Sequence, residues 1–304
     1  MPDKGASILA QLKNKAKLSG VAYQQCLQLF FQEEFLRRLS KSEYAENLIL
    51  KGGLFVYTLT NFESRATVDV DFLLRYMNSG LDHMDEVIAK ILATHTGNND
   101  VVVLTAKKTI PIAVQRKYPG VSTQIIGHIK NVRVPFDVDI GVGDIIIPGA
   151  QRRTVRTQLD GYETPEILTY SLESTIAEKF DAILQRFELT GRMKDFFDIY
   201  YLANTFCFDG RSLQEAIMQT LSNRGTPYNK ESFDRIITLT DDSDMLVKWR
   251  YFLKNIRNKE LPFSDVLDSI NLFLRPIWSS IVREDEFFGE WDCVAKAWKV
   301  EDIR

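Results

Sequence analysis

The pattern of apolar and polar positions changes along the chain. Through the first half, short runs rich in β-branched residues alternate with stretches in which apolar residues recur at helical spacing. The runs are typical of strands and the longer stretches of amphipathic helices. In the second half the helical spacing continues nearly to the end. The pattern therefore predicts an α+β N-terminal domain over residues 1–163 and an all-helical C-terminal domain over residues 164–304.

Spacing also places the individual elements of the first domain. The predicted order is helices over residues 6–40, a short buried segment over 47–59, a strand over 66–74, a helix over 81–95, a β-branched run over 100–112 and two strands around a turn over 125–144. In the last strand, apolar residues from Val132 to Ile140 alternate with polar ones, which is the period of a half-buried strand. Pro135 within it indicates an edge position or a bulge.

The strand predicted over residues 66–74 carries two like charges on one face. Strand alternation places Asp69 and Asp71 there, together with Arg65 and Thr67. Aspartate is depleted in strands, and two neighbouring carboxylates repel each other. A hard divalent cation such as Mg²⁺, which prefers carboxylate oxygens, would offset that repulsion. The alternative is a solvated face on which nearby arginines pair with the aspartates.

A further aspartate on a second strand could complete a site for two metal ions. Carboxylates bridge the two cations in such sites. Asp139 is the first choice for the third ligand and Asp137 the second, because both lie on the polar face of the alternating strand. Gly52-Gly53 precedes both strands, and two glycines allow a phosphate to approach backbone amides at a helix start.

Composition and charge limit the remaining possibilities. The formal net charge is −3, so contact with a nucleic acid requires a local basic cluster. Candidate clusters are Lys107-Lys108, Arg116-Lys117 and the group of Arg152, Arg153 and Arg156. The three cysteines and three histidines are scattered, without the spacing of a disulfide framework or a metal site. No apolar run is long enough for a membrane span and no secretion signal is evident, so we expect a cytoplasmic protein without membrane contact.

Two longer blocks resemble a known family. RLSKSEYAENLILKGGLFVYTLTNFESRATVDVDFLL and the later YSLESTIAEKFDAILQRFELTGRMKDFFDIYYL are similar to AbiEii-type nucleotidyltransferase toxins, a branch of the DNA polymerase β-like nucleotidyltransferase superfamily. The second block matches that family's signature of A-E-K followed by R-x-K-D-[FY]-x-D. The resemblance covers roughly residues 24–205. One departure is Gly52-Gly53 where the wider superfamily has Gly-Ser, which leaves no hydroxyl at that point to contact a phosphate.

The resemblance implies a fold, an activity and partners. The implied fold is a polymerase β-like domain, a mixed sheet flanked by helices, with a helical domain that completes the active-site cleft. The implied activity is metal-dependent transfer of nucleotides from an NTP to an RNA acceptor, with the tRNA 3′ end as the expected target. Mg²⁺ is the expected cofactor, with Mn²⁺ as the alternative. We expect a monomer that inhibits translation and growth, serves phage defence by abortive infection, and is countered by a cognate antitoxin.

The resemblance also gives roles to individual residues. The expected metal ligands are Asp69, Asp71 and Asp139, and the expected catalytic set adds Lys179 and Asp195. The expected contacts to the NTP are Gly52, Gly53, Arg65, Thr67, Lys179, Arg192 and Asp198. From the pattern alone, Arg65 could instead pair with the strand aspartates, and Lys179 could be a solvated helix lysine. Asp195 and Asp198 lie on one helix face, where they could orient Lys179 and Arg192 or position the acceptor. The alternative is a surface carboxylate pair that interacts with Lys194.

Three other functions use part of the same residue set. A nucleotidyltransferase that modifies a protein would have the same metal core. A catalytically silent module would bind a triphosphate without turnover. A glycosyltransferase would use the D-x-D of Asp69 and Asp71 for a nucleotide-sugar, but Gly52-Gly53 and the third aspartate argue against it.

Overall fold

Two compact units make up the chain. The computed structural model of the protein describes residues 3–60, 62, 64–65, 67–112, 119–187, 192–256 and 260–300. The first unit comprises Met1–Gly143 and Ala150–Tyr170, and the second comprises Asp144–Gly149 and Ser171–Arg304. Each unit has its own buried core.

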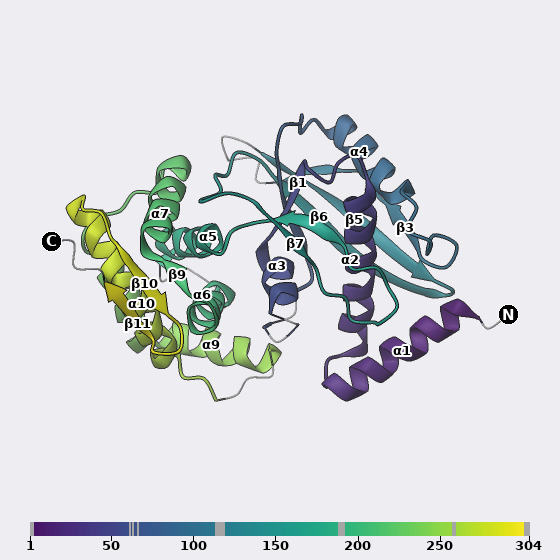
Figure 1. Cartoon of the computed structure of the whole chain (residues 1–304). Helices are drawn as coiled ribbons and strands as arrows, with labels where there is room; N and C mark the ends of the chain where they lie inside the picture. Colours follow the sequence, from purple (N-terminus) through teal and green to yellow (C-terminus); the bar gives the residue numbers. More distant parts are fainter. Residues whose placement is uncertain are drawn as a thin grey trace. The chain divides into compact units, whose positions relative to one another are not determined.

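A mixed eight-stranded sheet forms the core of the first unit (Figure 1). Its strands are β1 (Leu48–Lys51), β2 (Val70–Leu74), β3 (Val103–Ala106), β4 (Ile110–Ile112), β5 (Gly120–Ile129), β6 (Val132–Gly141), β7 (Gln151–Thr154) and β8 (Glu166–Thr169). The order across the sheet is β3-β5-β6-β2-β1-β8-β7, and β4 pairs with β5. The pairs β2–β6 and β1–β8 are parallel, while the other pairs are antiparallel. The sheet is therefore mixed, as predicted.

The division between the units differs from the predicted boundary at residue 163 because of β8. This strand pairs with β1 and β7, which ties it to the first unit. The segment Asp144–Gly149 belongs to the second unit, where the Ile147 N–H donates to Ser174 Oγ at 2.8 Å. Contacts between distant parts of the chain set both boundaries, and local spacing does not reveal such contacts.

Helix α2 is the central helix of the first unit. The helices here are α1 (Lys4–Ser19), α2 (Tyr23–Lys41), α3 (Gly52–Leu59) and α4 (Leu81–Ala93). α2 packs against β6, β8 and α4, and it is buried on nearly all sides, although its sequence suggests a single apolar stripe. Glu34 within it accepts from Arg37 Nε at 2.9 Å and from Arg38 Nε at 3.0 Å. These pairs compensate for the burial of charge.

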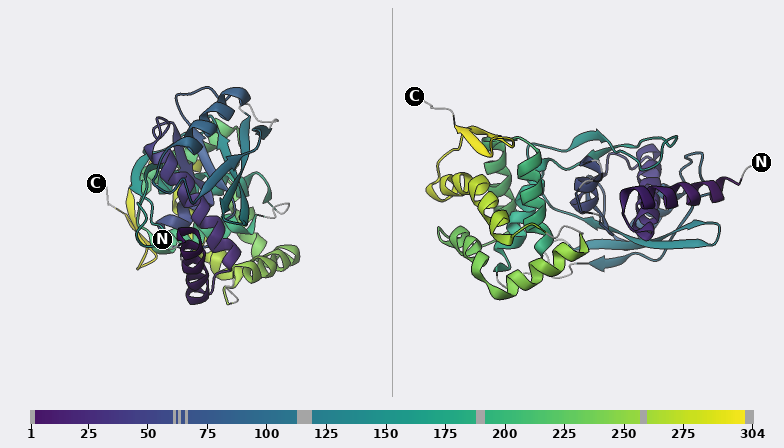
Figure 2. Two further views of the ribbon diagram at one scale, coloured as in Figure 1. Left: turned by 90° about the vertical axis from the view of Figure 1, so that its right-hand side faces the viewer. Right: turned by 90° about the horizontal axis from the view of Figure 1, so that it is seen from below.

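β5 and β6 form a long antiparallel hairpin (Figure 2), and β6 follows the predicted alternation. Val134, Phe136, Val138 and Ile140 are buried, and the residues between them are exposed or half-buried. β2 pairs with β6 from Val138 to Gly141. Pro135 lies before that point. Among the described residues, this part of β6 is paired with β5 on one side and with no strand on the other. This position resembles an edge, which is where a residue without an N–H is tolerated.

The second unit is helical, as predicted, with one addition. Its helices are α5 (Leu172–Leu184), α6 (Met193–Thr205), α7 (Gly210–Arg224), α8 (Ser232–Ile237), η2 (Thr238–Asp241), α9 (Ser243–Asn255) and α10 (Phe263–Arg283). The addition is a small sheet of β9 (Phe208–Asp209), β10 (Gly289–Asp292) and β11 (Ala297–Val300), in the order β11-β10-β9. The sequence analysis did not predict it, because strands of two and four residues are too short to show a period.

Two indole N–H groups attach this small sheet to the helices. Trp291 Nε1 donates to the Ala203 carbonyl of α6 at 2.7 Å, and Trp298 Nε1 donates to the Phe273 carbonyl of α10 at 2.9 Å. The same rings pack against Phe273. α5 in turn packs against α6 and α7, which completes the core of this unit. No helix in the described ranges is both long and apolar enough to cross a membrane.

Candidate active site

Four polar side chains form a row across neighbouring strands of the first unit. Asp71 on β2 is the register partner of Asp139 on β6. Lys51 on β1 pairs with Asp71 from the other side, and Ser122 on β5 pairs with Asp139. Directly paired positions point to the same face of a sheet. The structure thus brings together the two strand aspartates that the sequence analysis selected, and all four residues are half-buried.

The segment before β2 does not continue the strand. β2 begins at Val70, so Arg65, Thr67 and Asp69 precede it, and the predicted alternation from residue 65 to residue 71 is wrong for these three residues. The parallel register with β6 starts at Val70, which leaves the earlier residues without a ladder partner among the described pairs. Asp69 nevertheless lies within electrostatic range of Asp139, as the pKa of Asp139 shows.

Burial and like charges act together on Asp139. Burial raises the pKa of this carboxyl above its ordinary value, and the nearby carboxylates of Asp69 and Asp137 raise it further. A hydrogen bond from the Ser122 side chain opposes these effects. Asp137 has a different neighbour, since its Oδ1 accepts from Gln124 Nε2 at 3.2 Å. The geometry thus separates the two candidates for the third ligand, because Asp139 is the one paired with Asp71.

Helix α3 begins against these carboxylates. Gly52 adopts φ +70°, in the left-handed region, and a Cβ placed on it would lie 2.2 Å from Asp71 Oδ2. A Cβ on Gly53 would lie 2.7 Å from Thr67 Oγ1. Any larger residue would collide with groups predicted to take part in the site. Lys51, the N-cap residue of α3, makes no capping hydrogen bond with its side chain, and the amides at the start of a helix are suited to an anion.

The carboxylates suit a magnesium ion that a substrate helps to bind. Aspartate oxygens are the hard donors that Mg²⁺ prefers, and this ion commonly takes one or two protein carboxylates together with substrate phosphates. No group of three or more His, Cys, Asp or Glu side chains in the described part of the chain is already arranged to hold a metal. Asp71 and Asp139, with Asp69 nearby, therefore fit the donor set of Mg²⁺ without forming a complete cage.

In the second unit, Lys179 is a buried partner of two carboxylates. Its Nζ lies 2.5 Å from Asp198 Oδ2 and 3.5 Å from Asp195 Oδ1. Arg192 Nε also pairs with Asp195. Only 10% of the Lys179 side chain and 1% of each aspartate side chain are exposed, so the reading of Lys179 as a solvated lysine is wrong. Lys194 is exposed, and the buried aspartates orient Lys179 and Arg192.

The candidate basic clusters differ in their surroundings. Arg152 pairs with Glu46 and lies 3.8 Å from Glu166, so carboxylates balance its charge. Arg156 and Lys107-Lys108 are exposed. Arg116-Lys117 lies outside the described residues. Exposed cations of this kind can contact a phosphate backbone, but their arrangement alone does not define an RNA surface.

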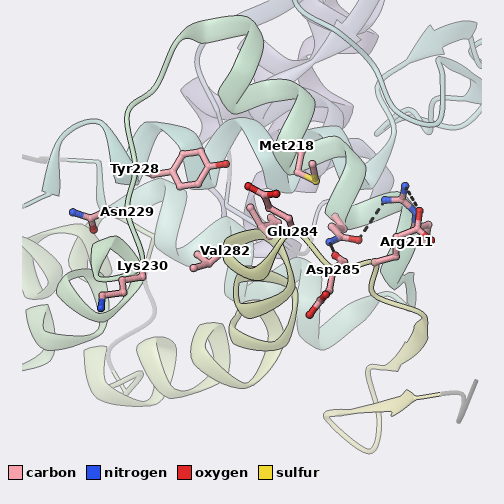
Figure 3. Close-up of a pocket in the computed structure, with 11 residues that line it drawn as sticks. Arg211, Met218, Tyr228, Asn229, Lys230, Val282, Glu284 and Asp285 are labelled. Atoms are coloured by element: carbon pink, nitrogen blue, oxygen red, sulfur yellow. Dashed lines mark hydrogen bonds and ion pairs between the residues drawn. The ribbon is translucent and has the colours of Figure 1, made fainter.

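Two of the pockets, one in each unit, can be compared with the predicted site. One in the second unit, about 650 Å³ in volume, is bounded by α7, residues 228–230 and the end of α10 (Figure 3). None of the predicted site residues lines it. The other, in the first unit, has a volume of about 160 Å³ and includes Thr67 in its wall. The larger pocket is therefore separate from the predicted chemistry, and we base the candidate site on the paired carboxylates.

Several residues of the first unit were missed by the sequence analysis. Lys51 is the register partner of Asp71, and its Nζ lies 5.1 Å from the centre of the Tyr170 ring. Gln28 and Gln32 reach the backbone of the segment before β2. A lysine directly before a glycine pair is a weak signal in a sequence, and the two glutamines gave none, since only the tertiary structure shows which carbonyl they reach.

The fold and the aspartate pair define a class of protein. A mixed sheet with carboxylates on two adjacent strands, beside a helix that opens with two glycines, is the arrangement expected of a nucleotidyltransferase. The chain belongs to the family described as nucleotidyl transferase AbiEii toxin, type IV toxin–antitoxin system, which matches residues 34–269. It is therefore a nucleotidyltransferase of toxin type, and membership of a toxin–antitoxin family implies a cognate antitoxin. This membership also sets aside the glycosyltransferase alternative.

Solved structures support the fold. JHP933 from Helicobacter pylori superimposes with a TM-score of 0.50 at 13% sequence identity, covering 86% of this chain and 95% of that one. MenT4, the nucleotidyltransferase toxin Rv2826c from Mycobacterium tuberculosis H37Rv, superimposes with a TM-score of 0.52 at 15% identity, covering 86% of this chain and 98% of that one. No curated protein sequence matches the chain. At such low identity the likeness concerns the fold alone.

Proposed function

We propose that this toxin transfers a nucleotide from an NTP to an RNA acceptor, the 3′ end of tRNA, and that Mg²⁺ or Mn²⁺ supports the transfer. The observation that carries the metal requirement is the register pairing of Asp71 with Asp139 on adjacent parallel strands. A modified acceptor end cannot be charged with an amino acid, so translation and growth stop. The proposed place of action is the cytoplasm, the proposed state is a monomer, and the proposed benefit is phage defence.

In the first unit, Asp69, Asp71 and Asp139 are the proposed metal ligands. A bound cation would neutralise the triphosphate and favour ionisation of the attacking hydroxyl. The amides of Gly52 and Gly53 would face phosphate oxygens at the start of α3. Thr67 Oγ1 lies beside Gly53, where it could donate to the same phosphate. Arg65, also half-buried in this segment, would add a bidentate contact.

In the second unit, Lys179 and Arg192 are the proposed phosphate contacts. Asp198 and Asp195 hold these cations, and this fixes the direction in which their remaining N–H groups can donate. Arg192 is 36% exposed at its side chain and Lys179 only 10%, so Arg192 is the more accessible donor. The catalytic role proposed for Asp195 is to position both cations, because its carboxylate pairs with each of them.

The choice of RNA as acceptor rests on the resemblance of the sequence blocks to the toxin family and on exposed basic residues. Lys107-Lys108 and Arg156 are exposed, although the whole chain has a formal net charge of −3. RNA recognition would then depend on local phosphate contacts and be sensitive to salt. A protein acceptor would use the same carboxylates, which makes it the first alternative. A silent nucleotide-binding module is the second.

The test is incorporation of label. Purified protein is incubated with total tRNA, Mg²⁺ and each labelled NTP in turn, with the Asp71→Asn variant as the inactive reference. We expect label on tRNA with wild-type protein and none with the variant. Label on a protein instead of on RNA would establish the first alternative. Triphosphate binding without any labelled product would establish the second.

A further inference from the structure

Two glutamines of α2 hold the segment that precedes β2. Gln28 Nε2 donates to the Val68 carbonyl at 2.6 Å, and Gln32 Nε2 donates to the same carbonyl at 2.7 Å. The two residues are four positions apart and therefore lie on one face of the helix. Both side chains are buried, with 8% of Gln28 and none of Gln32 exposed. One backbone oxygen thus accepts from two buried amides.

Val68 itself gives the segment little other support. Its side chain is 58% exposed, so apolar burial does not anchor this residue. The ladder between β2 and β6 begins two positions later, at Val70. Asp69 lies between Val68 and Val70. The residue before it is held by the two glutamines, and the residue after it is held by the sheet. The carbonyl bonds fix the backbone immediately before this aspartate.

Burial of two glutamines in a helix needs a reason. A buried amide without a partner costs free energy, whereas leucine or methionine would fill the same volume without that cost. The Val68 carbonyl offsets this cost for the two amide N–H groups, because it accepts from both of them, whereas Gln32 Oε1 has no hydrogen-bond partner among the described residues. A donor pair that fixes the backbone in this way also determines where the following side chain lies. Mutation of residues that hold a metal ligand in place typically costs about 10–100-fold in metal affinity or activity.

We propose that Gln28 and Gln32 are positioning residues that set the place of Asp69 relative to Asp71 and Asp139. This inference rests on the proposed function, in which Asp69 is a metal ligand. The two glutamines touch neither the nucleotide nor the metal. They act on the reaction through the Val68 backbone.

Hydrogen exchange tests the tether without any ligand. The variant Gln28→Met/Gln32→Met keeps side-chain volume and removes both donors, and Gln24→Met is the control because Gln24 is exposed on the same helix. We expect amides near residues 67–69 to exchange at least about tenfold faster in the double variant and at the wild-type rate in the control. Each single variant keeps one bond and should give an intermediate rate. Unchanged exchange in the double variant would overturn the inference.

Binding of Mn²⁺, followed by the electron paramagnetic resonance of the free ion, then separates the two proposals. With NTP present, we expect the double variant to raise the dissociation constant of Mn²⁺ about 10–100-fold. If wild type binds Mn²⁺ and the double variant binds it equally well, the glutamines do not position the ligand, although the metal site stands. If wild type does not bind, or Asp71→Asn binds as well as wild type, the proposed metal site fails and this inference fails with it.

A second observation, independent of the first, concerns two cysteines of the second unit. The Sγ atoms of Cys207 and Cys293 lie 3.8 Å apart, although 86 positions separate the residues. Cys207 precedes β9 and Cys293 follows β10, and these strands pair with Trp291 opposite Phe208. Cys207 is exposed and Cys293 partly exposed, whereas Cys26 is buried. The sequence analysis found no spacing that indicates such a pair.

We infer that Cys207 and Cys293 form a site of reversible oxidation that joins β9 to β10. With hydrogen peroxide as oxidant, one thiolate attacks a peroxide oxygen and breaks the O–O bond. The products are a sulfenic acid and hydroxide, and the hydroxide takes up the proton that the thiol lost and becomes water. The second thiol attacks that sulfur, forms the S–S bond and releases a second water. Burial raises the pKa of Cys293, so its thiol is the less reactive one at neutral pH and Cys207, the exposed thiol, is expected to react first.

Peptide mapping under non-reducing conditions tests this site. After exposure to peroxide we expect a crosslinked peptide containing both residues, lighter by two hydrogen atoms, with Cys26 still free. The melting temperature should rise by about 5 °C, because a crosslink over a long loop restricts the unfolded chain. Cys207→Ser and Cys293→Ser should each abolish both effects. Oxidation of each thiol separately, with no crosslinked peptide, would overturn the inference.

Discussion

The charged groups of the candidate site are arranged in opposite ways in the two units. In the first unit, carboxylates gather, and Asp69 and Asp137 raise the pKa of Asp139 in addition to the effect of burial. In the second unit, the buried carboxylates of Asp195 and Asp198 pair with cations at short distances. Repulsion is a cost that a bound cation would remove, whereas a buried ion pair is already compensated. Loss of a charge from the candidate site should therefore affect activity alone in the first unit, and stability in addition to activity in the second.

The largest expected effect is on activity, from Asp71→Asn. This variant keeps the shape of the side chain but removes a charge from the proposed metal site, so we expect incorporation of nucleotide to fall about a thousandfold. The free energy of unfolding should stay within about 0.5 kcal/mol of wild type, since the amide keeps the volume of the side chain and the position is only half-buried. Asp100→Asn, an exposed position in the same unit, is the control. Circular dichroism that shows Asp71→Asn unfolded would contradict the comparison.

The next effect is on stability, from Lys179→Met. Removing this cation leaves buried carboxylates without one of their partners, which typically destabilises a protein by about 3–5 kcal/mol. Chemical denaturation should show the loss. Lys194→Met, an exposed lysine of α6, should change the free energy of unfolding by less than about 0.5 kcal/mol. Equal stability of the two variants would mean that the buried carboxylates of Asp195 and Asp198 do not depend on the charge of Lys179.

Gly52→Ala should lower both the activity and the stability of the protein. Its φ of +70° costs about 1–2 kcal/mol for a residue with a Cβ, and that Cβ would displace Asp71 Oδ2 from a distance of 2.2 Å. We expect activity to fall about a hundredfold, because a displacement of this size misplaces a reacting group. Gly97→Ala is the matched control, with φ +80° and no atom within 4 Å. Both variants should lose stability, but activity should fall only for Gly52→Ala.

The last effect, which concerns stability and not activity, is that of pH on the buried Glu33 of α2. Burial raises the pKa of this carboxyl to about 8, although Arg37 and the Gln158 N–H oppose the shift. Because the folded state holds this proton more tightly than the unfolded state, the contribution of Glu33 to stability is greatest at low pH and is lost as pH rises from about 4.5 through about 8. The loss should not exceed about 1.4 kcal/mol per pH unit.

The measurement is the free energy of unfolding at several pH values in that window. Glu33→Gln should flatten the profile, because the amide does not ionise and its oxygen can still accept from the Gln158 N–H, now at 2.9 Å from Glu33 Oε1. Glu86→Gln, at an exposed position on α4, should leave the profile unchanged. A wild-type profile that rises across the window would contradict the prediction.

Local spacing was sufficient for part of the site. The alternation of β6 and the like charges around β2 pointed to Asp71 and Asp139 before their pairing was known. Spacing placed Asp69 on the strand, where it does not lie, because the start of a strand depends on where its neighbour begins to pair. Spacing also did not decide whether Lys179 is solvated or buried, because the sequence of a helix does not reveal which residues pack against each of its faces.

The sequence by itself determined which half of the chain is β-rich, which half is helical, and which carboxylates stand on strand faces, because these follow from repeat periods and from side-chain chemistry. Only the tertiary structure decided strand order and register, the hold of Gln28 and Gln32 on the Val68 carbonyl, and the approach of Cys207 to Cys293. The reason is physical. Periodicity shows which face of each segment is buried. Contacts between residues far apart in the sequence depend on how the whole unit packs.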